Sequence, residues 1–316
     1  MKKTALVLGA TGGIGGEVAR LLMARGWNVK ALHRAPERAA KPNDGIRWLA
    51  GDAMNRDEVV NAAHGVQLIV HAVNPPGYRN WGALVLPMID NSIAAARASG
   101  ARILLPGTVY NYGPDAFPIL DEESPQRPVT RKGAIRVEME ARLQAAAADG
   151  VRTLIVRAGD FFGPKAGNNW FAQGLVKPGK PVTGISYPGS AGVGHQWAYL
   201  PDVAETMVQL VEKEDQLATF ARFQMEGHWD ADGTQMVAAI ARAARKPELK
   251  ASAFPWWLLA LASPFVAVFR ELREMRYLWQ QPVQMSNKRL VRMLGAEPRT
   301  PLDVAVQRTL SGLGSI

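Results

Sequence analysis

Short apolar runs alternate with amphipathic segments along the first two thirds of the chain. The apolar runs predict buried strands at Thr4–Leu8, Trp27–Leu32, Ile46–Ala50, Gln67–Val73, Arg102–Leu105 and Val151–Arg157. The amphipathic segments between and after them predict helices at Glu17–Arg25, Asp57–Ala63, Trp81–Ser99, Val137–Ala148 and Asp202–Val211. This alternation predicts right-handed crossovers and a parallel sheet that is covered by helices on both faces.

The alternation weakens after about residue 223, and residues 164–195 are rich in Gly, Pro and aromatic residues, which is typical of loop. We therefore predict an α/β fold whose Rossmann-type, doubly wound parallel sheet is formed by residues 1–164 and 196–222. Residues 165–195 and 223–316 are expected to form a smaller, C-terminal substrate-binding or lid domain. It would lie against the carboxyl edge of the sheet, where open α/β sheets hold their ligands.

A glycine-rich loop joins the first predicted strand to the first predicted helix. Gly9, Gly12 and Gly15 have the spacing G-x-x-G-x-x-G, which allows a tight turn and a close approach of the backbone to a pyrophosphate. The helix that follows presents free N–H groups to the phosphates. Because the loop lies between a strand and a helix, it predicts a dinucleotide site. The residues expected to contact the dinucleotide are these three glycines together with Thr11, Gly13 and Ile14.

The second predicted strand ends at His33 and Arg34. A site that prefers NAD usually places a carboxylate there, to hold the ribose hydroxyls. A histidine and an arginine suit a 2′-phosphate better, because the guanidinium presents a planar fork of donors to phosphate. The sequence therefore favours NADP(H) over NAD(H) as the cofactor, with an ordinary surface arginine as the alternative interpretation.

Five segments that span residues 4 to about 210 resemble the extended branch of the short-chain dehydrogenase/reductase superfamily, the NAD-dependent epimerase/dehydratase-like proteins. They are GATGGIG at 9–15, GD at 51–52, HAVN at 71–74, VRAGDFFGP at 156–164 and YLPDVA at 199–204. The resemblance implies that Asp52 and Ala53 lie at the adenine and that Val73, Asn74 and Pro75 line the adenosine and ribose. It also implies that the segment from Ala158 to Phe161 approaches the nicotinamide. Asp52 as a cap of the next segment, and Asn74-Pro75 as part of a turn, are the alternatives.

The resemblance also implies a catalytic Ser or Thr, a Tyr, and a Lys four residues after the Tyr. Tyr112-Gly113 resembles the family's Tyr-Gly, which assigns the hydroxyl position to Thr108. The following helix has Lys132 and Arg136 where the family has Tyr and Lys, and no Tyr-x-x-x-Lys occurs in the chain. The usual proton donor is therefore missing.

Lys132 could replace the tyrosine in one of two ways. It could donate a proton if Arg136 and burial depress its pKa, or it could stabilise an oxyanion as a fixed cation. Arg136 could hold the ribose or a substrate phosphate, and two ordinary surface cations are the equally weighted alternative. Other candidate donors are Tyr110, Tyr112, Tyr187 and His195, for each of which a buried or packing role is the more common alternative. Tyr110 is slightly favoured over the others because of its position.

The composition limits the possible partners. The chain has 316 residues, a net charge of +9 and no cysteine, so disulfides, thiolate metal sites and a cysteine nucleophile are impossible; we predict no metal site. The basic residues are interleaved with acidic ones, so we expect no nucleic-acid partner. The N-terminal apolar run is too short for a signal peptide, so we expect a cytoplasmic protein.

Residues 254–269 carry no charge, and Arg270, Arg273 and Arg276 follow. The run is too short to span a bilayer and contains Pro264. We rank a lid or core role for residues 254–276 first, a dimer face second and contact with a membrane surface third. A homodimer is implied only by the resemblance.

Two functions remain open from the sequence. The first is an NADPH-dependent oxidoreductase or epimerase-like enzyme that acts on a small carbonyl or hydroxyl substrate with an atypical active site. The second is a non-catalytic NADP(H)-binding redox sensor or regulator, which the missing tyrosine supports.

Overall fold

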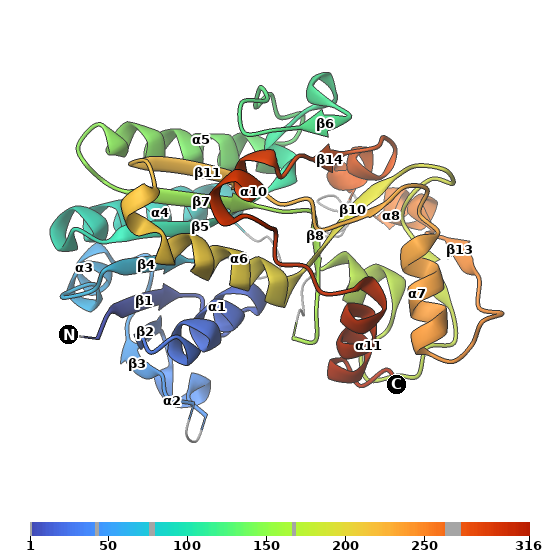
Figure 1. Ribbon diagram of the computed structural model, residues 1–316, viewed down its shortest axis with the longest axis horizontal. Helices are drawn as coiled ribbons and strands as arrows, with labels where there is room; N and C mark the ends of the chain where they lie inside the picture. The colour runs from blue at the N-terminus through green and yellow to red at the C-terminus, as the bar shows by residue number, and fades with distance from the viewer. Residues whose placement is uncertain (1, 42–43, 76–79, 166–168, 263–272) are drawn as a thin grey trace.

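The computed structural model describes residues 2–41, 44–75, 80–165, 169–262 and 273–316. Its largest element is a seven-stranded sheet with the strand order β11-β7-β5-β4-β1-β2-β3 and parallel pairing throughout (Figure 1). The strands are β1 (Thr4–Leu8), β2 (Asn28–His33), β3 (Arg47–Ala50), β4 (Leu68–His71), β5 (Arg102–Gly107), β7 (Thr153–Arg157) and β11 (Phe220–Gln224). The predicted doubly wound α/β fold is confirmed.

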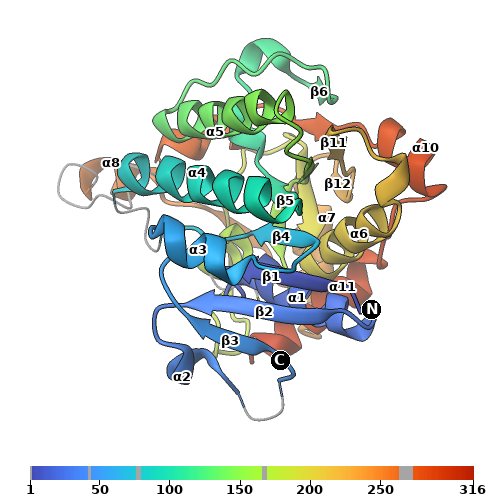
Figure 2. The ribbon, with the colours of Figure 1, turned by 90° about the vertical axis from the view of Figure 1, so that its left-hand side faces the viewer.

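Helices cover both faces of this sheet (Figure 2). One layer contains α3 (Arg56–Ala62), α4 (Trp81–Ser99) and α5 (Arg131–Ala147). The other contains α1 (Gly13–Ala24), α6 (Leu200–Glu212) and α10 (Lys288–Leu294). Each layer buries its own apolar core against the sheet, which explains why the central strands are apolar on both faces.

A second, smaller group of elements lies beside the large sheet, at the right of Figure 1. It is built on a three-stranded sheet of β8 (Asp160–Phe162), β10 (His195–Tyr199) and β12 (His228–Asp230). Helices α7 (Gln235–Ala243) and α11 (Leu302–Gly312) pack against it. The remaining described elements are α2 (Pro36–Ala39), β6 (Ile119–Leu120), β9 (Ile185–Tyr187), β13 (Ala251–Ala253), α8 (Trp256–Ala262) and β14 (Gln284–Met285). Short 3-10 helices lie at Val109–Asn111, Pro114–Ala116, Glu214–Gln216 and Met275–Trp279, and a π-helical turn lies at Phe171–Leu175.

Three predictions from the sequence need correction. Helix α5 begins at Arg131, six residues before the predicted start, because the Thr130 hydroxyl accepts the backbone N–H of Gly133 at 3.0 Å and caps the first turn. Residues 164–195 are not all loop, since they contain β9 and the π-helical turn. The seventh strand, β11, was not predicted and ends at Gln224. The proposed division into two domains stays a prediction.

Among the described residues, no helix is both long enough and apolar enough to cross a bilayer. The uncharged segment contributes α8, on which Trp257 and Leu258 are exposed. Residues 263–272, the rest of that segment and the start of the basic stretch, lie outside the described part of the chain.

Two histidines are buried in the fold in their neutral form. The His71 ring is 2% exposed at the end of β4, and its Nδ1 lies 2.8 Å from the Ser92 hydroxyl. Burial, helped by the charge of Arg136, lowers the pKa of His71 to about 3. Burial, helped by Arg299, lowers the pKa of His228 to about 4.

We predict that these histidines make the protein acid-labile. An unfolded histidine binds a proton below about pH 6.5, whereas these two do not until the pH is far lower, so stability is lost as the pH falls from 6.5 towards 4. The free energy of unfolding should decrease by about 1.4 kcal/mol per pH unit for each histidine. Urea denaturation of the wild type and of H228Q between pH 7 and pH 5 measures this, and equal slopes for the two proteins would contradict the assignment.

Candidate functional site

The candidate cofactor residues follow neighbouring strands along one edge of the large sheet. Strand order places the ends of β3 and β2 on one side, the glycine loop after β1 in the middle, and the ends of β4, β5 and β7 on the other side. The chain reverses its winding direction between β1 and β4, and such a reversal opens a crevice at the carboxyl ends of the strands. An elongated ligand can therefore lie along this edge with its centre at the glycine loop.

The glycine loop is built by close backbone contacts at this reversal. Gly9 has φ +93°, and a Cβ there would lie 2.5 Å from the carbonyl oxygen of Ala72, which follows β4. A Cβ on Gly15 would collide with the Gly9 carbonyl oxygen. Gly12 caps α1 without any side chain, and the first turn of the helix contains no acidic residue. The free N–H groups of Gly13 and Ile14 at the start of α1 are thus available to an anion.

The end of β2 presents basic groups beyond the loop, whereas the carboxylate of Asp52 follows β3. Arg34 is exposed, and its guanidinium has no hydrogen bond or ion pair with the described residues. The His33 ring is held by the backbone N–H of Ala35, which donates to its Nδ1 at 3.1 Å. Asp52 accepts the N–H of Met54 at 3.0 Å, so one carboxylate oxygen closes its own turn. The carbonyl of Ala53 accepts from Asn91 at 2.9 Å.

The segment after β4 is linked to the catalytic helix. The Asn74 side chain accepts the indole N–H of Trp81 at 2.8 Å, while Val73 is half-buried and Pro75 buried. The Arg136 guanidinium lies 5.0 Å above the ring of Trp81, a cation–π contact. Arg136 is therefore a packed cation between α4 and α5, with its Nε buried and unpartnered among the described residues.

The start of α5 and the turn after β5 meet at close range. A Cβ on Gly133 would collide with the backbone oxygen of Tyr110, so this position requires glycine. Lys132, the preceding residue, is 3% exposed and has an interaction partner. Thr108 and Tyr110 are half-buried on the facing turn. The structure thus brings the predicted catalytic residues Thr108, Tyr110, Lys132 and Arg136 into one region, whereas their catalytic roles stay predictions.

A buried polar network lies directly beneath Thr108. The Arg157 guanidinium, on β7, donates to both carboxylate oxygens of Glu140, on α5, at 2.9 and 2.8 Å. It also donates to the backbone oxygen of Thr108. The Asn111 amide donates to Glu140 at 2.8 Å and to Gln126 at 3.0 Å. Both charges are almost fully buried, with side chains 3% and 7% exposed.

This network fixes the direction of the hydrogen bond made by the Thr108 hydroxyl. Both hydrogens of the Asn111 amide are donated, so its oxygen can only accept, and the hydroxyl of Thr108 donates to it at 2.5 Å. The oxygen of Thr108 is therefore left as an acceptor. If the hydroxyl turned to donate to a ligand, the amide oxygen would lose its partner in a fully buried position, at a cost of about 1–3 kcal/mol.

The other candidate tyrosines are part of the core. The ring of Tyr112 is 1% exposed, and its hydroxyl accepts from Gln224 at 3.0 Å. Burial raises the pKa of Tyr112. Burial and the nearby carboxylates Asp230 and Asp160 raise the pKa of Tyr187. Both side chains therefore suit packing better than proton transfer near neutral pH.

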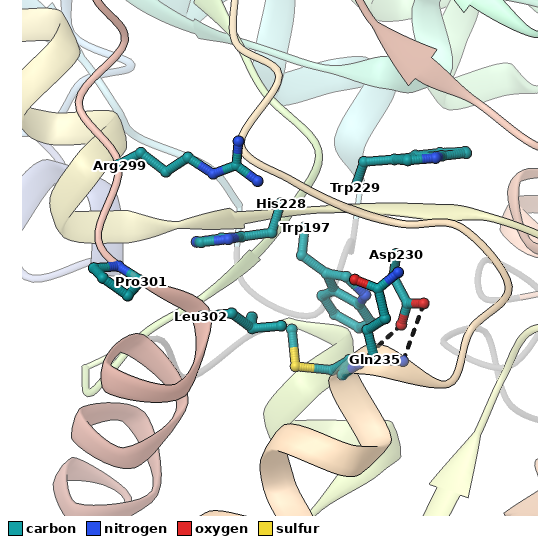
Figure 3. A pocket seen from close by; sticks show the side chains of 9 residues that line it. Trp197, His228, Trp229, Asp230, Gln235, Arg299, Pro301 and Leu302 are labelled. Atoms are coloured by element: carbon teal, nitrogen blue, oxygen red, sulfur yellow. Dashed lines mark hydrogen bonds between the residues drawn. The ribbon is translucent and has the colours of Figure 1, made fainter.

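A separate cavity of about 330 Å³ opens in the smaller part of the molecule (Figure 3). Arg299 lies over the His228 ring, with Trp197 and Gln235 opposite. None of the individual residues predicted to contact the cofactor or to act in catalysis lines this cavity, although its lining residues other than Trp197 lie within residues 223–316, the predicted substrate-binding or lid domain. The individually predicted residues place the candidate cofactor and catalytic site at the sheet edge.

The family to which the chain belongs is shown by a family model that matches most of its length. Residues 5–224 match the NAD dependent epimerase/dehydratase family. The chain belongs to this family. The matched range includes the glycine loop, the turn after β5, helix α5 and β11, so it contains both the sheet edge and the helix that carry the predicted site residues Gly9 to Gly15, Thr108, Lys132 and Arg136.

Relatives of this family share the fold at low sequence identity. UDP-glucuronic acid 4-epimerase from Bacillus cereus, in complex with UDP-glucuronic acid and NAD, superposes with a TM-score of 0.78 at 13% identity over 98% of both chains. WbmH from Bordetella bronchiseptica, in complex with NAD+, gives 0.72 at 16% identity over 99% of this chain and 98% of its own. A 3-diazoavenalumate denitrifying reductase from a Streptomyces species is 31% identical over 178 residues, 51% of this chain and only 57% of that relative.

Sequence reasoning missed the polar network and the carboxylate partner of His195. Asn111, Glu140 and Arg157 come from three elements far apart in the chain, so no local spacing marks them. The sequence marks His195 only as one of several candidate donors, whereas in the structure its Nε2 lies 2.8 Å from a carboxylate oxygen of Asp160. The one available signal was the charge of Arg157 and Asp160 within an otherwise apolar and glycine-rich stretch.

We predict that E140Q destabilises the protein strongly. The substitution leaves the Arg157 charge without its counter-ion in a buried site, which costs about 3–5 kcal/mol. Chemical denaturation measures the loss. The matched control is E138Q on the same helix, where the partner Arg142 is solvent-accessible and the expected loss is below about 1 kcal/mol. Equal losses for the two variants would contradict a structural role for the network.

Proposed function

We propose that the protein is an NADP(H)-dependent oxidoreductase or epimerase-like enzyme that acts on a small or moderately apolar carbonyl or hydroxyl compound. The observation that carries the proposal is the glycine loop at the β1/β4 reversal. There the backbone of Gly9 packs closely against that of Ala72. The N-terminus of α1, which has no side-chain cap, lies at the same edge of the sheet. Family membership and the 31% identical reductase support an oxidoreductase.

The residues along the edge fit a dinucleotide with a 2′-phosphate. The pyrophosphate would lie on the free N–H groups of Gly13 and Ile14, with Thr11 beside it. Arg34 and His33 would hold the 2′-phosphate, because these two basic residues, and not a carboxylate, lie at the end of β2. Asp52 and Ala53 would flank the adenine, Val73, Asn74 and Pro75 the adenosine and ribose, and Ala158 to Phe161 the nicotinamide.

The nicotinamide cofactor supplies a hydride when it is bound, and the residues of the chain handle the substrate oxygen. Lys132 stabilises the negative charge that develops on that oxygen, as a cation in a buried site. Thr108 accepts a hydrogen bond from the hydroxyl group of the alcohol form, because its own proton is committed to Asn111. Arg136, held over Trp81, adds positive charge on the ribose side. Tyr110 packs beside them.

The lysine at position 132 also favours a second candidate, a non-catalytic NADP(H)-binding redox sensor. In that case Lys132 and Arg136 are structural cations and the protein acts through a partner. The two functions differ in one measurable property, turnover of the bound cofactor.

We predict that R34A weakens NADPH binding without affecting NADH. Loss of a guanidinium–phosphate contact costs about 1.5–3 kcal/mol, a roughly 10–100-fold rise in Kd. Titration by nucleotide fluorescence measures the two constants. The control is R47A, which removes an exposed arginine at the opposite end of the neighbouring strand β3. Equal affinity of the wild type for NADH and NADPH would contradict the proposed preference.

We predict that the wild type oxidises NADPH with at least one member of a panel of aldehydes and ketones, and that K132M lowers the rate about 100-fold. Methionine fills the buried volume of the lysine stem without its charge, so the fold and the Kd for NADPH should be kept. Absorbance of NADPH follows the reaction. NADPH binding with no turnover across the panel would contradict the enzyme hypothesis and favour the redox-sensor hypothesis.

A further inference from the structure

A histidine–aspartate pair lies where the chain leaves the large sheet. Asp160 begins β8, three residues after Arg157, which ends β7. Arg157 is paired with Gly107, the residue before Thr108, and its guanidinium donates to the Thr108 backbone oxygen. The chain therefore reaches Asp160 after leaving the large sheet at the same end at which Thr108 lies.

The partner of Asp160 comes from β10, at the start of the strand. In the three-stranded sheet Trp197 lies opposite both Asp160 and His228, and His195 lies opposite Asp230. Opposite residues, and residues two apart on one strand, point to the same face. The pair Asp160–His195 thus shares one face with the second histidine, His228, which has no carboxylate partner among the described residues.

The imidazole of His195 is held rigidly in this position. Its Nε2 lies 2.8 Å from the Asp160 carboxylate. Its ring stacks on Trp279 with the centroids 3.6 Å apart and the planes at 7°. The ring of Trp197 meets it edge-on at 4.9 Å. The two aromatic rings fix the plane of the imidazole, and the carboxylate fixes the position of Nε2. The direction in which the other ring nitrogen, Nδ1, points is therefore fixed as well.

The second nitrogen, Nδ1, is the free one. It has no hydrogen-bond partner among the described residues. Unlike the indole nitrogens of Trp197 and Trp279, which are buried without a partner, it is not fully enclosed by protein atoms. The ring therefore has one nitrogen committed to a carboxylate and one that keeps an open approach. This is the arrangement in which a carboxylate orients an imidazole and stabilises its charged form while the other nitrogen transfers a proton.

Other ionisable groups near His195 do not compete for this role. Asp230, opposite His195 on β12, has its carboxylate occupied by the backbone N–H groups of Gly233, Gln235 and Met236. Tyr187 is buried with a raised pKa. The Asp160 side chain is 29% exposed and that of His195 only 9%, so solvent reaches the pair mainly at Asp160.

We propose that His195, oriented by Asp160, is the proton donor that takes the place of the missing tyrosine in carbonyl reduction. The proposal rests on the proposed function. The carbonyl carbon gains a hydride from bound NADPH, which becomes NADP+, and the electron pair of the C=O bond moves to the oxygen. His195 Nδ1 gives its proton to that oxygen, which becomes the alcohol hydroxyl. The imidazole is left neutral; it keeps its Nε2 proton, which is donated in a hydrogen bond to the Asp160 carboxylate, and solvent returns the proton lost from Nδ1.

The test compares H195Q with H228Q. In H195Q, the glutamine amide can still donate a hydrogen bond to Asp160 but cannot gain or lose a proton. H228Q is the matched control, because His228 lies on the same face of the sheet and has no carboxylate partner among the described residues. Single-turnover NADPH oxidation is measured from pH 6 to pH 9 with the best carbonyl of the panel. H195Q is expected to lose at least 100-fold in rate and to lose the decline of the rate at alkaline pH. H228Q should stay within about twofold of the wild type, and all three proteins should bind NADPH equally.

A second readout does not depend on turnover. With ¹⁵N-labelled histidine, adding benzyl alcohol to the NADP+ complex should shift the Nδ1 resonance of His195, assigned by its loss in H195Q, and leave that of His228 unmoved. D160N should abolish this shift. An H195Q enzyme with a wild-type rate and pH profile overturns the proposal while the proposed function stands. If the wild type turns over no carbonyl, the proposed function fails, and an unmoved His195 resonance overturns the proton-donor role independently.

Discussion

The buried ion pair between Glu140 and Arg157 holds the candidate site together. It joins the catalytic helix α5 to β7, and through Arg157 and Asn111 it fixes both the backbone and the hydroxyl of Thr108. A pair this deeply buried gains little stability compared with an apolar contact, because both charges lose their hydration. The pair instead fixes geometry. Each Glu140 oxygen accepts from Arg157 and from one side-chain amide, Asn111 or Gln126, so the turn after β5 is held in one arrangement.

The orientation of the Thr108 proton changes how the site is understood. A hydroxyl that already donates to a buried amide offers only its lone pairs, so it suits a ligand group that carries a hydrogen. In the proposed mechanism Lys132 and the Asp160–His195 pair supply the donors instead, from two other elements. Three residues would then share the tasks that the resemblance assigns to one tyrosine and its neighbours.

The sequence predicted the sheet well because its strands are covered on both faces and read as continuous apolar runs. Helix α4 was found within its predicted bounds, Trp81–Ser99. Strand β11, at the sheet edge, mixes polar and apolar residues in Phe220–Gln224 and lacks that signal. In the site, the glycine loop was predictable because its spacing is local. The network of Asn111, Glu140 and Arg157, and the meeting of Asp160 with His195, depend on tertiary packing between distant segments, which no spacing in the sequence reports.

The hydrogen bond between Asn74 and Trp81 connects the predicted nucleotide site with helix α5. Asn74 follows β4, Trp81 begins α4, and the indole carries the guanidinium of Arg136 on α5. A ligand that took over the Asn74 amide oxygen would break its bond to the indole, and the indole in turn supports Arg136. Binding at that oxygen and the placement of this cation would then be thermodynamically linked. Such linkage is reciprocal, so a ligand that drew on Arg136 would alter the affinity at Asn74 by the same factor.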